Sequence, residues 1–494
     1  MKYIVSIFCA FATVLPVLSQ EQADTVASDS VKPRVWLAAI ENIGVTGFIV
    51  GYNNSVLSSS PFSKVTYESM KRNLTEFKWW WDEDFMYTNT IEHPYHGAIY
   101  YLTARENGLG MGTSALFSVG GSLIWELFGE SERPAYNDMV TTPIGGVTLG
   151  EPLHRISQAI IDDRARGLER VGRELLATIV NPSCGINRLL RGDSWRVRGG
   201  YKRQHLLTSR LSAGYRYLSV SEMPNVASAY LHWNTTYGDV MGAEGNGLFD
   251  YFDLDFTAVA GGHQTLLNYA RVTSQLWCGE SVRREAETAA DANGRKSSEH
   301  NWGFYNHFYY LYAEPDYAAD DYYRKFRNCV GYSEVGSVGP GYAYRATMPN
   351  VTWEQKFFLN GILLGATPMK LVDRVHPKVG YTWGSGYGAK IYSRLQAGEW
   401  LKMGLDVDCS QLFTWLGYRC HNVDDLTKVR AADIQGEKGN ALTFIAAPTV
   451  ELWPCHRVGL EVRGRYVWHK FNYLYHQHTT LDSIELLAGL IVRL

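Results

Sequence analysis

The chain has 494 residues, a formal net charge of −3 and an aromatic content of 13%, including 32 Tyr and 15 Trp. This length exceeds what one ordinary soluble core requires, and the nearly neutral charge argues against nucleic acid as a partner. Barrels in lipid use many aromatic residues because Tyr and Trp rings lie at both membrane–water boundaries. A soluble carbohydrate-binding β protein is the alternative for a chain so rich in aromatic residues.

The N-terminus is typical of an exported protein. Lys2 precedes an apolar run, and Val17-Leu18-Ser19 places small or apolar residues at a cleavage site. The run is short and a polar stretch follows it, which favours a signal peptide over a spanning helix. We therefore predict a signal peptide over residues 1–19 and a polar leader over residues 20–34.

Residues 35–194 are predicted to form a helical N-terminal domain. Its first part, Val35–Val50, is apolar but carries polar interruptions, so we expect a helix or strand packed on protein rather than a membrane span. From Trp79 to Leu190 the apolar spacing is helical. Asn181-Pro182 and Gly185 are expected to end this helical region.

From residue 195 to residue 494 the apolar period changes to two. In Val458–Trp468 the apolar side chains share one face, and Glu461, Arg463 and Arg465 share the other. A soluble sandwich turns the apolar face inward, whereas a barrel in lipid turns the charged face inward. Pattern alone does not separate these cases, but the aromatic content, the export signal and the long strands favour the barrel.

At roughly 25 residues per strand and loop, this region predicts around a dozen strands. The expected fold is therefore a transmembrane antiparallel β-barrel of about 12 strands, preceded by an α-helical plug or cap. The chain also ends on an alternating strand, Ile484–Leu494, as expected for a barrel that closes without an exposed edge.

The helical region brings together residue types that hydrolase sites need. A hydroxyl, an imidazole and a carboxylate supply a nucleophile, a general base and an orienting acid. Ser122 is the candidate nucleophile, His93 (or His154) its base, and Glu126 or Asp138 the acid. Polar residues recur every four positions here and form a polar stripe along one helix: Ser114, Ser118, Ser122, Glu126 and Glu130.

Charged residues nearby are candidates for substrate binding. Arg105 and Arg155 can hold a phosphate or a developing oxyanion, and Asn137 and Glu151 belong to the same candidate site. The structural alternative pairs Glu151 with Arg155 and makes Asp138 a helix N-cap. This alternative has the stronger support from the residues alone, because no G-x-S-x-G elbow, phosphate loop or H-E-x-x-H motif occurs.

Metal ions and cofactors are not expected. The cysteines show no CxxC or Cys/His spacing typical of a metal centre. Outside the signal peptide, six cysteines allow 15 disulfide pairings in an oxidising compartment. Cys409 and Cys420 are the favoured pair, because a turn between neighbouring strands can bring them together.

One dense block of motifs resembles the opening of an outer-membrane family of unknown function. The block runs from Asp82 to Ser157 and includes His93-Pro94-Tyr95-His96-Gly97, Gly121-Ser122, Trp125-Glu126, Asn137-Asp138 and Gly150-Glu151. One branch of that family is associated with lipid A deacylation, the removal of an ester-linked acyl chain. The chain does not resemble the small eight-stranded lipid A deacylase, so the catalytic residues of that enzyme are not carried over.

The resemblance implies an ester hydrolase of the cell outer membrane that needs no cofactor. Its expected partners are lipid A or lipopolysaccharide, outer-membrane lipid and the barrel-assembly machinery, with no nucleic acid. The alternative is a non-catalytic barrel, which is a channel, a transporter or an envelope-organising protein whose polar helix residues are structural.

Overall fold

The computed structural model describes residues 32–56, 64–76, 78–81, 84–198, 207–221, 223–242, 247–261, 266–285, 297–313, 330–368, 381–415, 438–474 and 477–494. They form two compact units. One is helical, and the other comprises Leu206–Leu494 together with a short segment at residues 84–86. The predicted signal peptide lies outside the described residues, and so does Cys420, the expected partner of Cys409.

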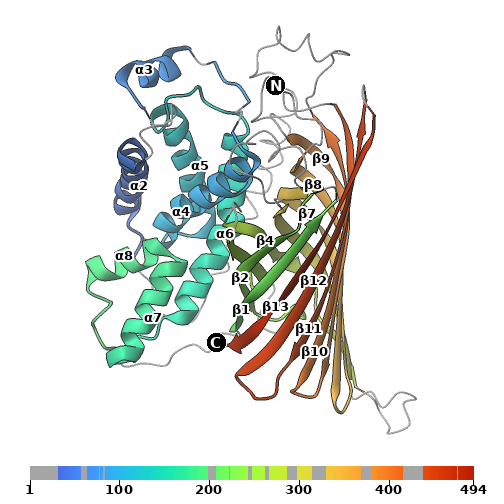
Figure 1. Ribbon diagram of the computed structural model, residues 1–494. Coiled ribbons are helices and arrows are strands. Elements are labelled where there is room, and N and C mark those ends of the chain that lie inside the picture. The colour runs from blue at the N-terminus through green and yellow to red at the C-terminus, as the bar shows by residue number, and fades with distance from the viewer. Residues whose placement is uncertain are drawn as a thin grey trace. The chain divides into compact units, whose positions relative to one another are not determined.

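The helical unit contains, in chain order, α2 (Val35–Val56), α3 (Tyr67–Glu76), η2 (Thr88–Glu92), α4 (His93–Glu106), α5 (Met111–Phe128), α6 (Asp138–Ile160), α7 (Gly167–Val180) and α8 (Pro182–Arg191) (Figure 1). Pro94 lies in the first turn of α4, where its missing N–H costs no hydrogen bond. The expectation that Asn181-Pro182 ends the helical region was wrong. Asn181 instead caps α8 by accepting a hydrogen bond from the Cys184 N–H.

The first helix is longer than its apolar run predicted. α2 has 22 residues, and its buried residues are Ala38, Asn42 and Thr46. Asn42 interrupts the run in sequence but fits the fold, because its side chain lies 3.4 Å from the carbonyl oxygen of Tyr100. By length and composition, α2 is the one helix in the described ranges that could cross a membrane.

The second unit is one closed antiparallel barrel. Twelve strands pair in a ring: β1 (Leu207–Val220), β2 (Val226–Tyr237), β3 (Phe252–Ala260), β4 (Leu267–Cys278), β6 (Ser297–Ala313), β7 (Val330–Thr347), β8 (Val351–Pro368), β9 (Tyr381–Ala397), β10 (Leu401–Thr414), β11 (Gly439–Leu452), β12 (Val458–Tyr473) and β13 (Thr479–Arg493). The pairing of β4 with β6 and of β1 with β13 closes the ring. A short strand, β5 (Val282–Glu285), adds to β6 outside it. The prediction of about 12 strands is confirmed.

The alternation along each strand turns charges inward. On β12, Leu460 and Val462 are exposed on the outer wall, while Glu461, Arg463 and Arg465 are buried inside. The outer wall also carries a set of exposed aromatic rings: Tyr215, Trp277, Trp302, Phe304, Tyr342, Trp353, Phe357 and Tyr387. An apolar, aromatic exterior around a charged interior is the arrangement of a barrel in lipid and the reverse of a soluble sandwich.

Candidate functional site

Close packing of α4 against α6 builds the polar core of the helical unit. A Cβ atom added to Gly97 would lie 1.8 Å from the carbonyl oxygen of Thr142, so at this crossing the two backbones touch. Gly146 lies against Gly97 in the same way, and Ser118 of α5 donates to the Gly97 carbonyl at 2.9 Å. Only glycine permits such an approach, and it brings side chains from three helices together.

His93 and Asp138 meet at the starts of these two helices. His93 is the first residue of α4, Asp138 is the first residue of α6, and His93 Nε2 lies 3.7 Å from Asp138 Oδ1. Both side chains are buried, and Asn137 Nδ2 donates to the same carboxylate oxygen at 2.8 Å. Three predicted site residues therefore lie together. Asp138 is not the N-cap, however, because Asn137 holds that position.

Ser122 lies beside Asp138 but does not contact the imidazole. Its Oγ donates to the Asp138 carbonyl oxygen at 3.3 Å and lies 3.5 Å from the sulfur of Met139. Within the described residues it makes no hydrogen bond to His93, so the predicted contact between nucleophile and base is absent. On the polar stripe of α5, the Ser118 and Ser122 hydroxyls both donate to backbone carbonyl groups of the neighbouring helices.

Glu126, one turn further along α5, has a different partner from the one predicted. Its Oε2 accepts a 2.6 Å hydrogen bond from the backbone N–H of Ala135, in the segment that leads into α6. The side chain is fully buried. This contact connects the end of α5 to the segment before Asp138, which is a positioning role at the edge of the candidate site.

His96 is a second imidazole that the sequence interpretation missed as a site residue. It lies one turn after His93, stacks on Tyr100 with 4.5 Å between ring centroids, and meets Trp125 edge-on at 4.8 Å. Its Nε2 is enclosed and has no hydrogen-bond partner among the described residues. Burial, reinforced by the nearby His93, lowers the pKa of His96 to about 3, so the ring is neutral at pH 7. The His-x-x-His spacing on one helix face was the available indication.

Glu151 forms the centre of a second cluster. Its carboxylate accepts from Tyr101 Oη at 2.7 Å and from the Nε atoms of Arg105 and Arg155, both at 2.9 Å. Burial alone would raise the pKa of Glu151, but the two guanidinium groups hold it well below the usual range. The predicted pairing of Glu151 with Arg155 is confirmed. Both candidate phosphate-binding arginines are bound to this one carboxylate.

Glu106 forms a third centre, which the sequence interpretation also missed. His154 Nδ1 and Asn181 Nδ2 each lie 2.7 Å from Glu106 Oε1, and Gln158 Nε2 lies 3.2 Å from Oε2. Burial raises the pKa of Glu106, but His154 and Asn181 more than offset it, so the pKa is lowered. His154, the alternative base, is therefore paired with Glu106. No group of three or more candidate metal ligands occurs in the described ranges.

The barrel interior is a separate polar cluster, and contacts cross it. Arg271 of β4 reaches Asp406 of β10 at 2.7 Å, although the two strands lie five places apart around the ring. Arg465 of β12 lies 4.0 Å from the ring centroid of Tyr269 on β4. Such contacts join distant strands, so side chains of the barrel itself fill this section of the lumen.

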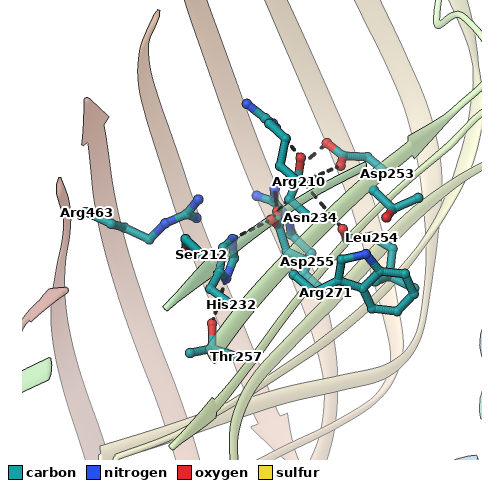
Figure 2. Close-up of polar contacts among 12 residues, drawn as sticks. Arg210, Ser212, His232, Asn234, Asp253, Leu254, Asp255, Thr257, Arg271 and Arg463 are labelled. Atoms are coloured by element: carbon teal, nitrogen blue, oxygen red, sulfur yellow. Dashed lines mark hydrogen bonds and ion pairs between the residues drawn. The ribbon is translucent and has the colours of Figure 1, made fainter. Parts of the chain in front are cut away.

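Figure 2 shows a histidine–aspartate pair within this interior. His232 Nε2 lies 3.4 Å from Asp255 Oδ1, and its Nδ1 lies 2.9 Å from Thr257 Oγ1. Asp255 also contacts Arg271, and Asn234 donates to it at 2.9 Å. All of these residues are buried. The arrangement resembles His93–Asp138 in composition but lies within a dense network of ion pairs.

Comparison with known proteins gives a partial match for the helical unit and low structural similarity for the barrel. Residues 78–183 match a family described as a domain of unknown function (DUF3943), which includes α4, α5 and α6. No curated protein matches the sequence significantly.

Among solved structures, the NanC porin shares 8% identity at a TM-score of 0.26, covering 58% of this chain and 98% of the porin. The COG4313 outer membrane channel from Pseudomonas putida F1 shares 9% identity at a TM-score of 0.24, covering 60% of this chain and 99% of the channel. The toluene transporter TodX of Pseudomonas putida shares 6% identity at a TM-score of 0.20, covering 59% of this chain and 90% of the transporter.

These structural scores are too low to carry an argument about function. The assignment to the membrane depends on the barrel itself, with its closed ring, its apolar and aromatic wall and its charged interior. The chain is an outer-membrane β-barrel protein in which residues 78–183 match a domain of unknown function.

Proposed function

We propose that the helical unit hydrolyses acyl esters of outer-membrane lipid, with lipid A as the substrate. The observation that supports this proposal is the buried pair His93–Asp138, joined to Asn137 and next to Ser122. An imidazole held by a carboxylate is the usual general base for ester hydrolysis. Packing of α4, α5 and α6 buries this pair away from bulk water, where charge interactions are stronger than in water.

In the proposed mechanism His93 is the general base and Asp138 orients its ring. The imidazole takes a proton from a water molecule as the water oxygen bonds to the acyl carbon. The proton then passes to the alcohol oxygen as the ester C–O bond breaks, giving a fatty acid and a free hydroxyl. Asp138 stabilises the positively charged imidazolium in between. Water is the nucleophile in this scheme because the Ser122 hydroxyl is directed to a backbone carbonyl.

Arg105 and Arg155 take a different role from the one predicted for an oxyanion. Arg105 lies twelve residues after His93 on α4, which places it about 18 Å further along the helix axis. An arginine at that distance does not reach the same ester carbonyl. In this proposal the pair, held by Glu151, attracts a phosphate of the lipid headgroup instead.

Mass spectrometry of lipid A tests the proposal in cells that lack the gene and carry a plasmid copy. Without the gene, lipid A should be heavier by one acyl chain, and wild type should restore the lighter form. His93→Ala should not restore it, whereas the matched control His232→Ala, which removes the barrel imidazole, should. Identical spectra with and without the gene would contradict the proposal. A change confined to phospholipids would contradict lipid A as the substrate.

Ser122→Ala separates water from serine as the nucleophile. Retention of most activity supports water, and a loss as deep as that of His93→Ala would reinstate the predicted serine nucleophile. The heat-dependent gel mobility of the folded barrel serves as the folding control for each variant.

A non-catalytic barrel is the second candidate, and one observation favours it. Ser122, Glu126 and Glu151 each bind a partner within the protein, as structural residues do. Within this alternative, a wide channel fits poorly with the contacts that cross the lumen, such as Arg271–Asp406. Single-channel recording should therefore give little current, and a large steady conductance would favour the channel.

A further inference from the structure

Several helices of the helical unit expose their apolar faces, whereas the helices of a water-soluble domain bury them. On α7 the exposed large apolar residues are Leu168, Val171, Leu175, Leu176 and Ile179, with Leu168 89% and Ile179 74% exposed. Four of them follow a spacing of three or four residues, so they form one stripe on one face of the helix. The apolar stripe of a soluble helix faces the core, but this one faces outward.

The opposite face of α7 is charged and buried. Arg170 is 5% exposed and pairs with Asp163 at 3.2 Å. Glu174 binds Arg188 of α8 at 2.8 Å, and Arg188 also contacts Asp163. Ion pairs therefore occupy the interior of the α7–α8 pair, where a soluble protein places leucines.

α8 and α2 repeat this inversion independently. On α8, Ile186, Leu189 and Leu190 are exposed while Asn187 and Arg188 are buried. On α2 two of the three buried residues, Asn42 and Thr46, are polar. The exposed face carries a set of large apolar residues: Val35, Trp36, Ile40, Ile43, Phe48, Tyr52 and Val56. Three helices from two separate parts of the sequence thus expose their apolar faces, with Trp36 84% exposed.

The barrel of the same chain has the same inversion, and there the outer surface contacts lipid. Polar groups inside and apolar groups outside are stable only where the surroundings are apolar, because exposed leucines gain nothing in water. The exposed charges at the borders fit a lipid surface as well. Arg166 directly precedes α7, and Arg196 follows α8 next to the exposed Trp195. Arginine and tryptophan beside an apolar stripe are typical of a helix at the boundary between acyl chains and anionic headgroups.

The barrel topology identifies the leaflet. β1 begins at the end of the barrel where the turns at residues 348–350 and 398–400 join consecutive strands. In outer-membrane barrels the short turns lie on the periplasmic side. Leu207, where β1 begins, therefore lies at the periplasmic end of the barrel.

We propose that α2, α7 and α8 insert their apolar faces into the periplasmic leaflet of the outer membrane, with Arg166 and Arg196 at the phosphates of its phospholipids. The occupant of this surface is phospholipid, not a protein partner. This inference does not depend on the proposed hydrolase. Because lipopolysaccharide occupies the other leaflet, this placement makes phospholipid the competing substrate for the His93 site. The mass spectrometry described under the proposed function distinguishes a change in phospholipid from a change in lipid A.

Photo-crosslinking from single positions of the full-length protein in cells tests the inference. A photoreactive phenylalanine analogue replaces Leu175 or Leu190, and Leu460 on the outer wall of the barrel is the positive control. Glu169 is the control on α7, because it is exposed, pairs with Arg173 and lies outside the stripe of Leu168, Val171, Leu175 and Ile179. Adducts are identified by mass, and heat-dependent gel mobility confirms a folded barrel.

Phospholipid adducts at Leu175 and Leu190 should appear within about twofold of the yield at Leu460, and roughly tenfold above the yield at Glu169. Three results would overturn the inference. Protein adducts at these positions would identify a protein partner, lipopolysaccharide adducts would place the surface in the other leaflet, and no adducts beside a positive Leu460 would mean exposure to water.

Discussion

The barrel and the helical unit both bury polar side chains and expose apolar ones, but they build their polar interiors differently. The barrel turns every second residue inward, and its charges meet across the lumen, as Arg271 meets Asp406. Around His93 the helical unit instead uses glycine contacts such as Gly97 against Gly146, which bring hydroxyl, imidazole and carboxylate groups together, while its arginines pair with Glu151 and within α7 and α8. The charges of the barrel interior neutralise one another, whereas the core of the helical unit leaves a base, His93, beside the Asp138 carboxylate.

The largest expected difference between the two regions is in activity. Asp138→Asn removes the charge that stabilises the His93 imidazolium, and we expect lipid hydrolysis to fall by about 10²–10⁴-fold. Asp255→Asn changes the equivalent carboxylate of the barrel pair and should leave the rate unchanged. The measurement is release of fatty acid from purified lipid A by the full-length protein. Equal losses in the two variants would show that neither pair is catalytic.

Glu151 gives the largest expected effect on stability. Glu151→Leu leaves Arg105 and Arg155 without their shared carboxylate, and we expect a loss of about 3–5 kcal/mol in the free energy of unfolding of the helical unit. Denaturant titration followed by the helical circular dichroism signal measures it, while gel mobility monitors the barrel. An unchanged helical transition would mean that the three side chains are not coupled.

Two glycines test the close contact between α4 and α6. Gly97→Ala places a methyl group on the Thr142 carbonyl, and we expect a loss of about 1–3 kcal/mol in the stability of the helical unit. Gly120→Ala is the matched control on α5, because nothing lies within 4 Å of its added Cβ. It should gain about 0.5–1 kcal/mol from helix propensity. The same unfolding transition measures the change in stability of both variants. We expect Gly97→Ala to lower the stability and Gly120→Ala to raise it.

The most gradual effect is the pH dependence that His96 gives the helical unit. Its pKa is about 3 when folded and about 6.5 when unfolded, so the unfolded chain binds the extra proton between these values. Stability is full above pH 6.5 and should fall by about 1.4 kcal/mol for each pH unit below it. The lowered pKa values of Glu106 and Glu151 reduce stability only below about pH 4.5, whereas burial raises the pKa of Glu41, which adds stability as the pH falls. The contribution of His96 is therefore isolated by the His96→Phe variant rather than by the pH interval alone. His96→Phe should remove most of this slope, and an unchanged slope would assign it to another group.

The two faces of each barrel strand were predictable, because alternating apolar and charged residues show which side chains share a face. Glu461, Arg463 and Arg465 were placed on one face from sequence and are buried in the lumen. The contacts across the lumen were not predictable, since they depend on how many strands separate two residues in the closed ring. Arg271 and Asp406, 135 positions apart, carry no local pattern that pairs them.

The helical unit was predictable in part. The helical spacing from Trp79 to Leu190 covered α4, α5, α6 and α7, but a separate helix after Asn181-Pro182 was not expected, because proline can begin a helix as well as end one. Membership of the polar core was predictable for Ser122 and Asp138. Their contacts were not, because the rotation of α5 decides whether a hydroxyl faces an imidazole or a carbonyl group, and residue spacing does not determine that rotation.

The contact between Arg271 and Asp406 also has a mechanical consequence. A ring of twelve strands can flatten into an ellipse without breaking any pairing between neighbours, since each pair needs only to hinge slightly. Arg271 joins two nearly opposite strands and acts as a spoke, and the Arg465–Tyr269 contact is another. These contacts across the lumen resist flattening, so the barrel should keep its cross-section when lateral pressure in the bilayer changes.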